Sequence, residues 1–220
     1  MSCMRTIRVT GKGRLKLRPD MTRISISLEG VSPEYGSALN RSSQDTERLK
    51  DLLINFGFER SDLKTLDFSV DTEYENYKVR DEYKRRFVGY RYRHRMKVEF
   101  VSDNARLGKV LYALAYSPVR PEFRLSYTVS DPEAARNELL GKAVRDAMDK
   151  SKVLSRAAGV TLKDIQAVDY SWGRIEFEVE PMEKLAPAGD ICPPSGSFDI
   201  DIEPDDIEVS DTVTVVWEIG

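Results

Sequence analysis

Strands that are apolar on one face only constrain the fold of this chain more than any other feature of its sequence. Between residues 88 and 100, apolar or aromatic side chains alternate with charged ones. A period of two is that of a β-strand with one buried and one exposed face. Similar stretches occur at residues 7–17, 24–28, 66–74, 123–129 and 207–219. One-sided strands favour a mostly antiparallel sheet that is covered on a single face.

Helix signals separate these strands. Asp131-Pro132-Glu133 combines a capping residue, a proline for the first turn and an acid near the positive helix end, and Gly159 supplies a left-handed stop. Ser32-Pro33-Glu34 and Gly57 repeat these start and stop signals, and Asp103 caps a shorter apolar segment. The chain therefore predicts three main helices between its strands.

The order of these segments predicts the fold class. From residue 20 to residue 129 it reads strand, helix, strand, strand, helix, strand, which is the ferredoxin-like βαββαβ order, and a further helix and further strands extend it. We expect an α+β protein with two layers, in which a mostly antiparallel (mixed) sheet carries about three helices on one face. We also expect a single domain over residues 1–220 and free cysteines, because so long a chain can bury a full core.

A long hairpin at about residues 64–101 is the most informative segment. Acids alternate along its first strand and bases along its second, so a fold near residue 82 places opposite charges across from each other. This charged face is our candidate subunit-contact surface. Its members are Asp67, Asp71, Glu73, Arg91, Arg93, Arg95 and Lys97.

Two further segments limit the alternatives. Gly11 and Gly13 interrupt an alternating strand and predict a bulge or a bend, while a dinucleotide-binding loop would need a third glycine where Lys16 stands. A Pro/Gly-rich acidic loop is expected at about residues 181–206. Its carboxylates lack the central glycine and the terminal acid of a calcium-binding loop.

Several of these segments together resemble a known family. The resemblance rests on Val9 to Gly13 with Pro19-Asp20, on Gly57, Asp62, Leu63 and Thr65, on Tyr74 and Gly89-Tyr90, on Val129 to Asp131, on Ala143, Ala147, Lys150, Ala158 and Gly159, and on residues 204–219. The chain resembles the SIMPL-domain family, relatives of bacterial oxidative-stress defence proteins and a periplasmic immunogenic protein. The resemblance implies a family without an established catalytic site, some members of which form ring- or channel-like oligomers.

Catalytic and metal chemistry find little support in the residues. His94 is the one histidine, it lies on the apolar face of its strand, and a packing role is favoured over a catalytic one. Cys3 and Cys192 give no metal-ligand spacing with it. We therefore name no catalytic residue, no cofactor and no metal site.

Net charge and targeting signals predict which partners the protein binds and in which compartment it lies. The net charge of −3 predicts no strong attraction to nucleic acid. The sequence has no run of about 18 apolar residues, so we expect no insertion into a membrane. Residues 1–10 lack the apolar run of a signal peptide, so we expect a cytoplasmic protein.

The first functional hypothesis is a non-enzymatic, homo-oligomer-forming structural or interaction protein, with a stress-related role implied only by the family resemblance. The second is a small-ligand-binding protein or an enzyme with an unrecognised pocket, which would require a cleft lined by clustered carboxylates or Tyr/Arg pairs. The third is a binder of anionic polymers, which would require the tyrosines and arginines of the hairpin to share a face.

Overall fold

The computed structural model describes residues 5–79, 82–170, 175–181, 198 and 202–220. It has three helices and two antiparallel sheets, and the expected α+β class is confirmed. Two compact units divide the chain. We call residues 20–127 with 180–204 the hairpin unit, and residues 1–19, 128–179 and 205–220 the terminal unit.

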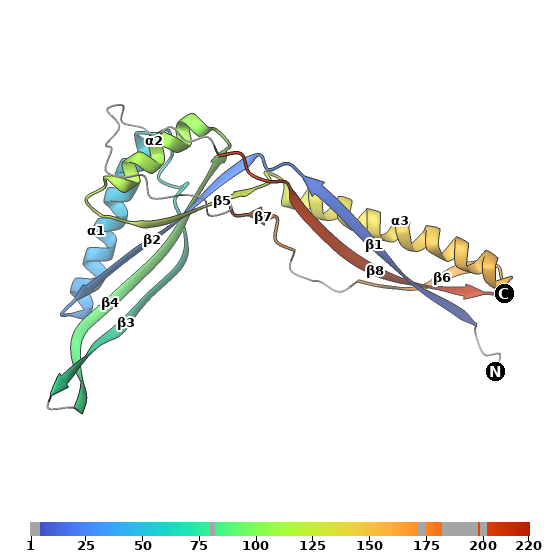
Figure 1. The fold of residues 1–220 in the computed structure, drawn as a ribbon, viewed down its shortest axis with the longest axis horizontal. Helices are drawn as coiled ribbons and strands as arrows, with labels where there is room; N and C mark the ends of the chain where they lie inside the picture. Colours follow the sequence, from blue (N-terminus) through green and yellow to red (C-terminus); the bar gives the residue numbers. More distant parts are fainter. Residues whose placement is uncertain (1–4, 80–81, 171–174, 182–197, 199–201) are drawn as a thin grey trace. The chain divides into compact units, whose positions relative to one another are not determined.

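The hairpin unit has the ferredoxin-like order that the sequence predicts. Its elements are β2 (Met21–Ser32), α1 (Tyr35–Ile54), β3 (Lys64–Val79), β4 (Glu82–Val101), α2 (Asn104–Ala115) and β5 (Glu122–Thr128). In its sheet the strand order is β3-β4-β2-β5. The neighbours β2 and β4 pair in antiparallel register from Met21–Val101 to Ser32–Tyr90 (Figure 1).

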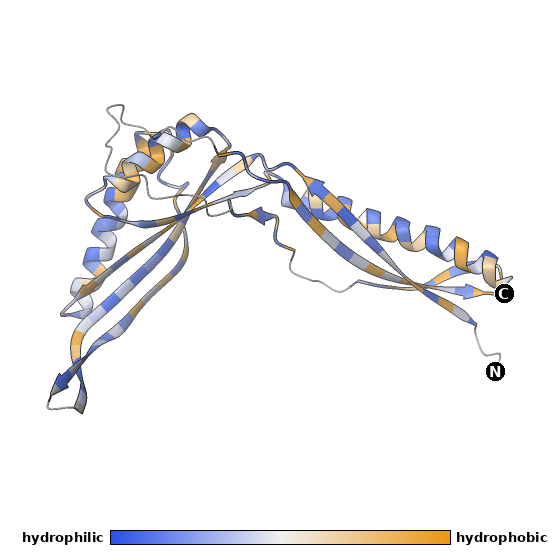
Figure 2. Ribbon diagram, viewed as in Figure 1, coloured by the Kyte–Doolittle hydropathy of each residue, from blue (hydrophilic) through white to orange (hydrophobic). Residues whose placement is uncertain are grey.

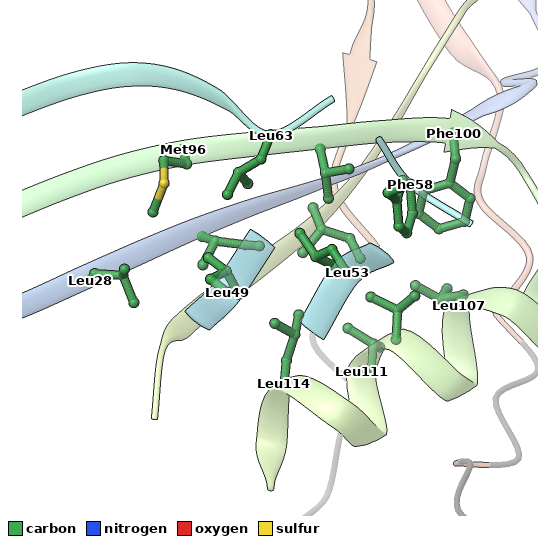
Figure 3. Packing of buried hydrophobic residues seen from close by; sticks show 14 of the residues in the cluster. Leu28, Leu49, Leu53, Phe58, Leu63, Met96, Phe100, Leu107, Leu111 and Leu114 are labelled. Carbon is green, nitrogen blue, oxygen red and sulfur yellow. The ribbon is translucent and has the colours of Figure 1, made fainter. Parts of the chain in front are cut away.

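Both helices of the hairpin unit pack on the same face of this sheet. Leu49 and Leu53 of α1 meet Leu107 and Leu114 of α2 over the apolar side chains of β2 and β4 (Figure 3). The buried residues that β2 and β4 contribute are Ile24, Ile26, Leu28, Tyr92, Met96, Val98 and Phe100. The one-sided alternation of β2 and β4 therefore marks the face that the helices cover.

The terminal unit is a three-stranded sheet with one long helix. Its elements are β1 (Thr6–Leu17), α3 (Pro132–Ala158), β6 (Leu162–Asp169) and β8 (Ile207–Ile219), and the sheet order is β1-β8-β6. Apolar and polar residues alternate along β1 and β8 (Figure 2). The apolar positions of these strands pack on Ala143 and Ala147 of α3.

Most of the predicted helix boundaries are correct. Asp103 accepts hydrogen bonds from two backbone N–H groups at the start of α2, and Asp131 accepts one at the start of α3. Gly159 ends α3 in the left-handed conformation. Glu34 occupies the capping position of α1, but its side chain makes no capping hydrogen bond. The Ser32-Pro33-Glu34 signal therefore predicts where α1 begins but does not supply a side-chain cap.

Gly11 and Gly13 serve a different purpose from the one we expected. The β1–β8 register runs without a shift from Thr6–Glu218 to Leu17–Ile207, so the predicted bulge is wrong. Instead, a Cβ at Gly11 would come within 2.1 Å of the carbonyl oxygen of Ala143. The glycines let α3 approach the backbone of β1, and a helix face rich in alanine completes this close packing.

The expectation of one sheet under three helices is also wrong, because β1 and β8 pair with each other along their whole length and form a separate sheet with β6. Alternation identifies a strand but does not specify its partner, so the sequence could not separate the two sheets. Most of the loop expected at residues 181–206 lies outside the described residues.

Candidate functional site

The charged face of the hairpin is a network of ion pairs within the chain. Arg91 of β4 binds Glu73 of β3 through two hydrogen bonds of 2.7 and 2.8 Å, and Arg95 lies 3.4 Å from Asp67. Arg91 also pairs with Glu29 of β2 at 3.3 Å, and Arg93 pairs with Glu29 at 2.6 Å. The acids and bases therefore face each other as the sequence predicts.

The remaining charged-face residues are also engaged within the chain. Lys97 lies 2.9 Å from Glu99, and Asp71 accepts a hydrogen bond of 3.1 Å from Ser69. A hydrogen bond from Arg93 lowers the pKa of Glu29, and one from Arg91 lowers the pKa of Glu73. Internal pairing of this kind leaves less charge available to a partner, and the role of the charged face as a subunit contact stays a prediction.

In the inner part of β4, between residues 90 and 95, the tyrosines and arginines alternate and so occupy opposite faces. Tyr92 is buried, and its hydroxyl donates a hydrogen bond of 2.7 Å to Asp45 of α1. Burial raises the pKa of Tyr92, and the bond to Asp45 adds to the effect, so the phenol remains the donor. A stacking surface for nucleic acid needs aromatic and basic groups on one face, and this part of β4 does not provide it.

His94 packs between a helix and a strand. Its Nδ1 lies 3.1 Å from Thr46 Oγ1 of α1, its Nε2 lies 2.9 Å from Thr65 Oγ1 of β3, and its ring meets Phe68 edge to face. Thr46 Oγ1 already donates to the carbonyl oxygen of Ser42, so it accepts from Nδ1–H. Burial lowers the pKa of His94, and the charge of Lys50 lowers it further. These contacts describe a neutral, packed histidine.

The outer part of the hairpin is a two-stranded ribbon. Pairing between β2 and β4 ends at Ser32–Tyr90, and a register shift between Glu73 and Tyr74 follows. Beyond this shift, β3 pairs with β4 as far as Val79–Glu82. We call residues 74–79 with 82–88 the distal ribbon; in Figure 1 it continues past the N-terminal end of α1.

A connected row of aromatic rings runs from the start of α1 onto one face of the distal ribbon. The rings of Tyr35, Tyr90, Phe87 and Tyr74 meet edge to face in that order, with centroids 5.4–5.7 Å apart. The guanidinium of Arg85 lies 4.8 Å from the centroid of Tyr74. We call these five residues the aromatic strip. Tyr35 is 51% exposed, and Tyr74 and Phe87 are each 45% exposed.

A polar cleft of about 520 Å³ lies along the first half of α1. Its helix wall presents Ser37, Asn40, Arg41, Gln44, Asp45 and Arg48, and Ser32, Pro118 and Val119 line the rest. This is a second place where the chain could hold a molecule.

Two features are absent from the described residues. Among them, no group of three or more His, Cys, Asp or Glu side chains is arranged to hold a metal ion. In the same part of the chain, no helix combines the length and apolarity needed to cross a bilayer.

Comparison with known proteins assigns the family. The sequence profile of SIMPL, described as a protein of unknown function (DUF541), matches residues 7–217. The chain belongs to the SIMPL family. The resemblance of its segments to that family is thereby confirmed.

Two curated relatives carry the same name. The chain is 27% identical over 157 residues to the 26 kDa periplasmic immunogenic protein of Brucella melitensis and equally to that of Brucella abortus. The match covers 71% of this chain and 62% of each relative, so this SIMPL protein aligns with less than two thirds of their length.

The expected cytoplasmic location is wrong. Both relatives are named as periplasmic proteins, and this finding overturns an inference that rested on residues 1–10. The first ten residues of a sequence report on a leader only if they are the start of the natural chain, so they are a poor guide to compartment.

Sequence reasoning missed the cleft and the full aromatic strip. The polar first half of α1 was the available signal for the cleft, because polar side chains recur there at helical spacing from Ser37 to Arg48. Phe87 joins the strip because of the register shift, and periodicity alone does not reveal such a shift.

Proposed function

We propose that this SIMPL protein is a self-associating structural protein and that its subunits meet through the β3–β4 hairpin. One observation carries the proposal, namely that the distal ribbon, as far as the described residues extend, is two-stranded and has an exposed aromatic face. Two-stranded hairpins are marginally stable in water unless they pack against something else. The ribbon therefore has a physical reason to bind a partner.

A second copy of this chain is the partner that the aromatic strip suits best. The strip presents both Tyr74 and the guanidinium of Arg85, so each copy offers both halves of a cation–π pair. A two-fold axis through the strip would place the Arg85 of one copy near the Tyr74 of the other, which is the self-complementarity that an isologous contact requires. β3 is also the outermost strand of its sheet and can pair with another edge.

The charged face borders this contact and forms its polar rim in the proposal. Arg91 and Glu73 lie at the inner end of the ribbon, and their pairing within the chain neutralises the rim before subunits meet. Rim charges of this kind set orientation more than affinity. We also propose that the protein acts in the periplasm, by analogy with the two Brucella relatives.

Size-exclusion chromatography with light scattering tests the proposal on the full chain at low and high salt. The expected result is an oligomer whose mass falls in a Tyr74→Ser/Phe87→Ser double variant. Both side chains are about half exposed, so the double substitution should leave the fold intact. Val153→Ser, on the exposed side of α3, is the matched control and should keep the oligomeric mass.

Two results would contradict the proposal. A monomeric mass at both salt concentrations removes self-association. An oligomeric mass that the Tyr74/Phe87 variant leaves unchanged removes the aromatic strip as the contact.

A further inference from the structure

The polar cleft of the hairpin unit is built on one stripe of α1. Ser37, Arg41, Gln44 and Arg48 recur at intervals of three or four residues, so they lie on one side of the helix. The opposite wall is different in character, because Pro118 and Val119 offer carbon surface there. A molecule in the cleft would meet charge and hydrogen-bonding groups on one side and apolar groups on the other.

A buried carboxylate fixes the electrostatics of the cleft. Asp45 is 8% exposed, and it accepts the hydroxyl hydrogen of Tyr92 from β4. Arg48 donates to its Oδ1 at 3.3 Å, and Nε of Arg41 lies 3.8 Å from its Oδ2. One carboxylate thus stands between two guanidinium groups, and the three side chains together carry one net positive charge.

The guanidinium groups keep hydrogen-bonding capacity toward the cleft. Arg41 donates to the carbonyl oxygen of Val31 at 3.3 Å, and the side chains of Arg41 and Arg48 are 55% and 62% exposed. A guanidinium has several N–H donors in a planar fork, more than these contacts use. Asn40 and Gln44 add amide groups beside them.

We propose that this cleft binds a small hydroxylated organic anion. Arg41 and Arg48 would hold its anionic group, since guanidinium forks match the geometry of carboxylates and phosphates. Ser37, Asn40 and Gln44 would hydrogen-bond to its hydroxyl groups, and Pro118 with Val119 would contact its carbon skeleton. Asp45 positions the two arginines and limits their net charge, so the cleft selects for a single anionic group.

This inference is independent of self-association. None of the cleft residues belongs to the aromatic strip or to the charged face, so a monomeric protein could still bind the anion.

Isothermal titration calorimetry of the full chain tests the site, with gluconate as the probe. Gluconate should bind saturably at micromolar to millimolar concentration, whereas uncharged glucose should give no heat and inorganic phosphate should bind more weakly. Arg41→Gln and Arg48→Gln should each weaken gluconate binding by about tenfold or more, since each removes a charge-assisted hydrogen bond. Both substitutions keep good helix formers on an exposed face.

Two further variants separate this site from general attraction of anions. Arg95→Gln is the matched control, because Arg95 is 59% exposed and also has one carboxylate partner, and it should bind gluconate as the parent does. Asp45→Asn keeps a side-chain oxygen that can accept hydrogen bonds and removes the charge that opposes the two arginines, so it should strengthen gluconate binding; binding weaker than in the parent would contradict the inference. No saturable gluconate binding would overturn the inference, as would equal affinity for phosphate or equal loss of affinity in Arg95→Gln.

Discussion

Gly11 of β1 and Ala143 of α3 lie in backbone contact, since a Cβ at Gly11 would stand 2.1 Å from the Ala143 carbonyl oxygen. The same Cβ would stand 2.3 Å from the backbone nitrogen of Ala147. Side chains of α3 also reach the backbone of β1: Asp146 accepts a hydrogen bond of 2.7 Å from the N–H of Lys12. The edge strand β1 is therefore held to α3 by a close backbone approach that only a glycine permits, and by the hydrogen bond between Lys12 and Asp146.

Gly11→Ala should destabilise the protein because the backbone of α3 cannot yield as a flexible side chain would. We expect a loss of about 1–3 kcal/mol or more in the free energy of unfolding, measured by chemical denaturation. Gly141→Ala in α3 is the control, because the nearest neighbour of its Cβ is the end of the Arg145 side chain at 3.9 Å. That change should stabilise the helix by about 0.5–1 kcal/mol. Equal effects of the two substitutions would contradict the close packing.

Tyr92→Phe should destabilise the protein by about 1–3 kcal/mol, because it deprives the buried Asp45 carboxylate of a hydrogen bond. Tyr127→Phe offers a matched comparison. The Tyr127 hydroxyl is equally buried, and among the described residues it has no hydrogen-bond partner. Its removal should therefore be neutral or slightly stabilising in the same denaturation assay. A larger loss in Tyr127→Phe than in Tyr92→Phe would contradict this assignment of the two hydroxyls.

The sequence predicts the elements of this fold better than their pairing. Alternation located β4 and β8, and capping residues located the start of α2 and α3, because these signals are local. The partner of β1 is β8, about 200 residues later in the chain, and no local signal encodes that pairing. Gly11 and Gly13 show the same limit, since a glycine that permits helix packing looks in the sequence like one that permits a bulge.

Of the candidate sites, the sequence predicts the charged face of the hairpin but not the polar cleft. Opposite charges across the hairpin follow from alternation alone, so the pairs Arg91–Glu73 and Arg95–Asp67 were predictable. The polar helix wall of the cleft has a signal in the sequence, but the cleft itself was not predictable, because it needs α1 and the loop at Pro118 to lie together. Only tertiary structure brings those segments into one site.

His94 should make the stability of the protein depend on pH near neutrality. Burial lowers its pKa in the folded state below the unfolded value of about 6.5, so protonation favours unfolding. The contribution of His94 is fully present above about pH 6.5 and is lost as the pH falls toward the folded-state pKa. The free energy of unfolding between pH 7.5 and pH 5.5 measures it. His94→Gln should flatten that dependence, since the chain has one histidine; an unchanged pH profile would exclude His94 as its source.

Protection of the distal ribbon against hydrogen exchange should depend on protein concentration. Among the described residues, the ribbon has two strands and no third strand pairs with it beyond Tyr90, so its backbone hydrogen bonds open readily in an isolated subunit. Self-association through the aromatic strip would cover them, and amides of residues 74–79 and 82–88 should exchange more slowly as concentration rises. Amides of residues 92–100 should show no such change, because β2 and both helices already cover that part of β4. Hydrogen exchange measured by mass spectrometry at two protein concentrations compares the ribbon with residues 92–100 in the same protein. If concentration changed the exchange rates of both segments equally, or of neither, the subunit contact would lie away from the ribbon.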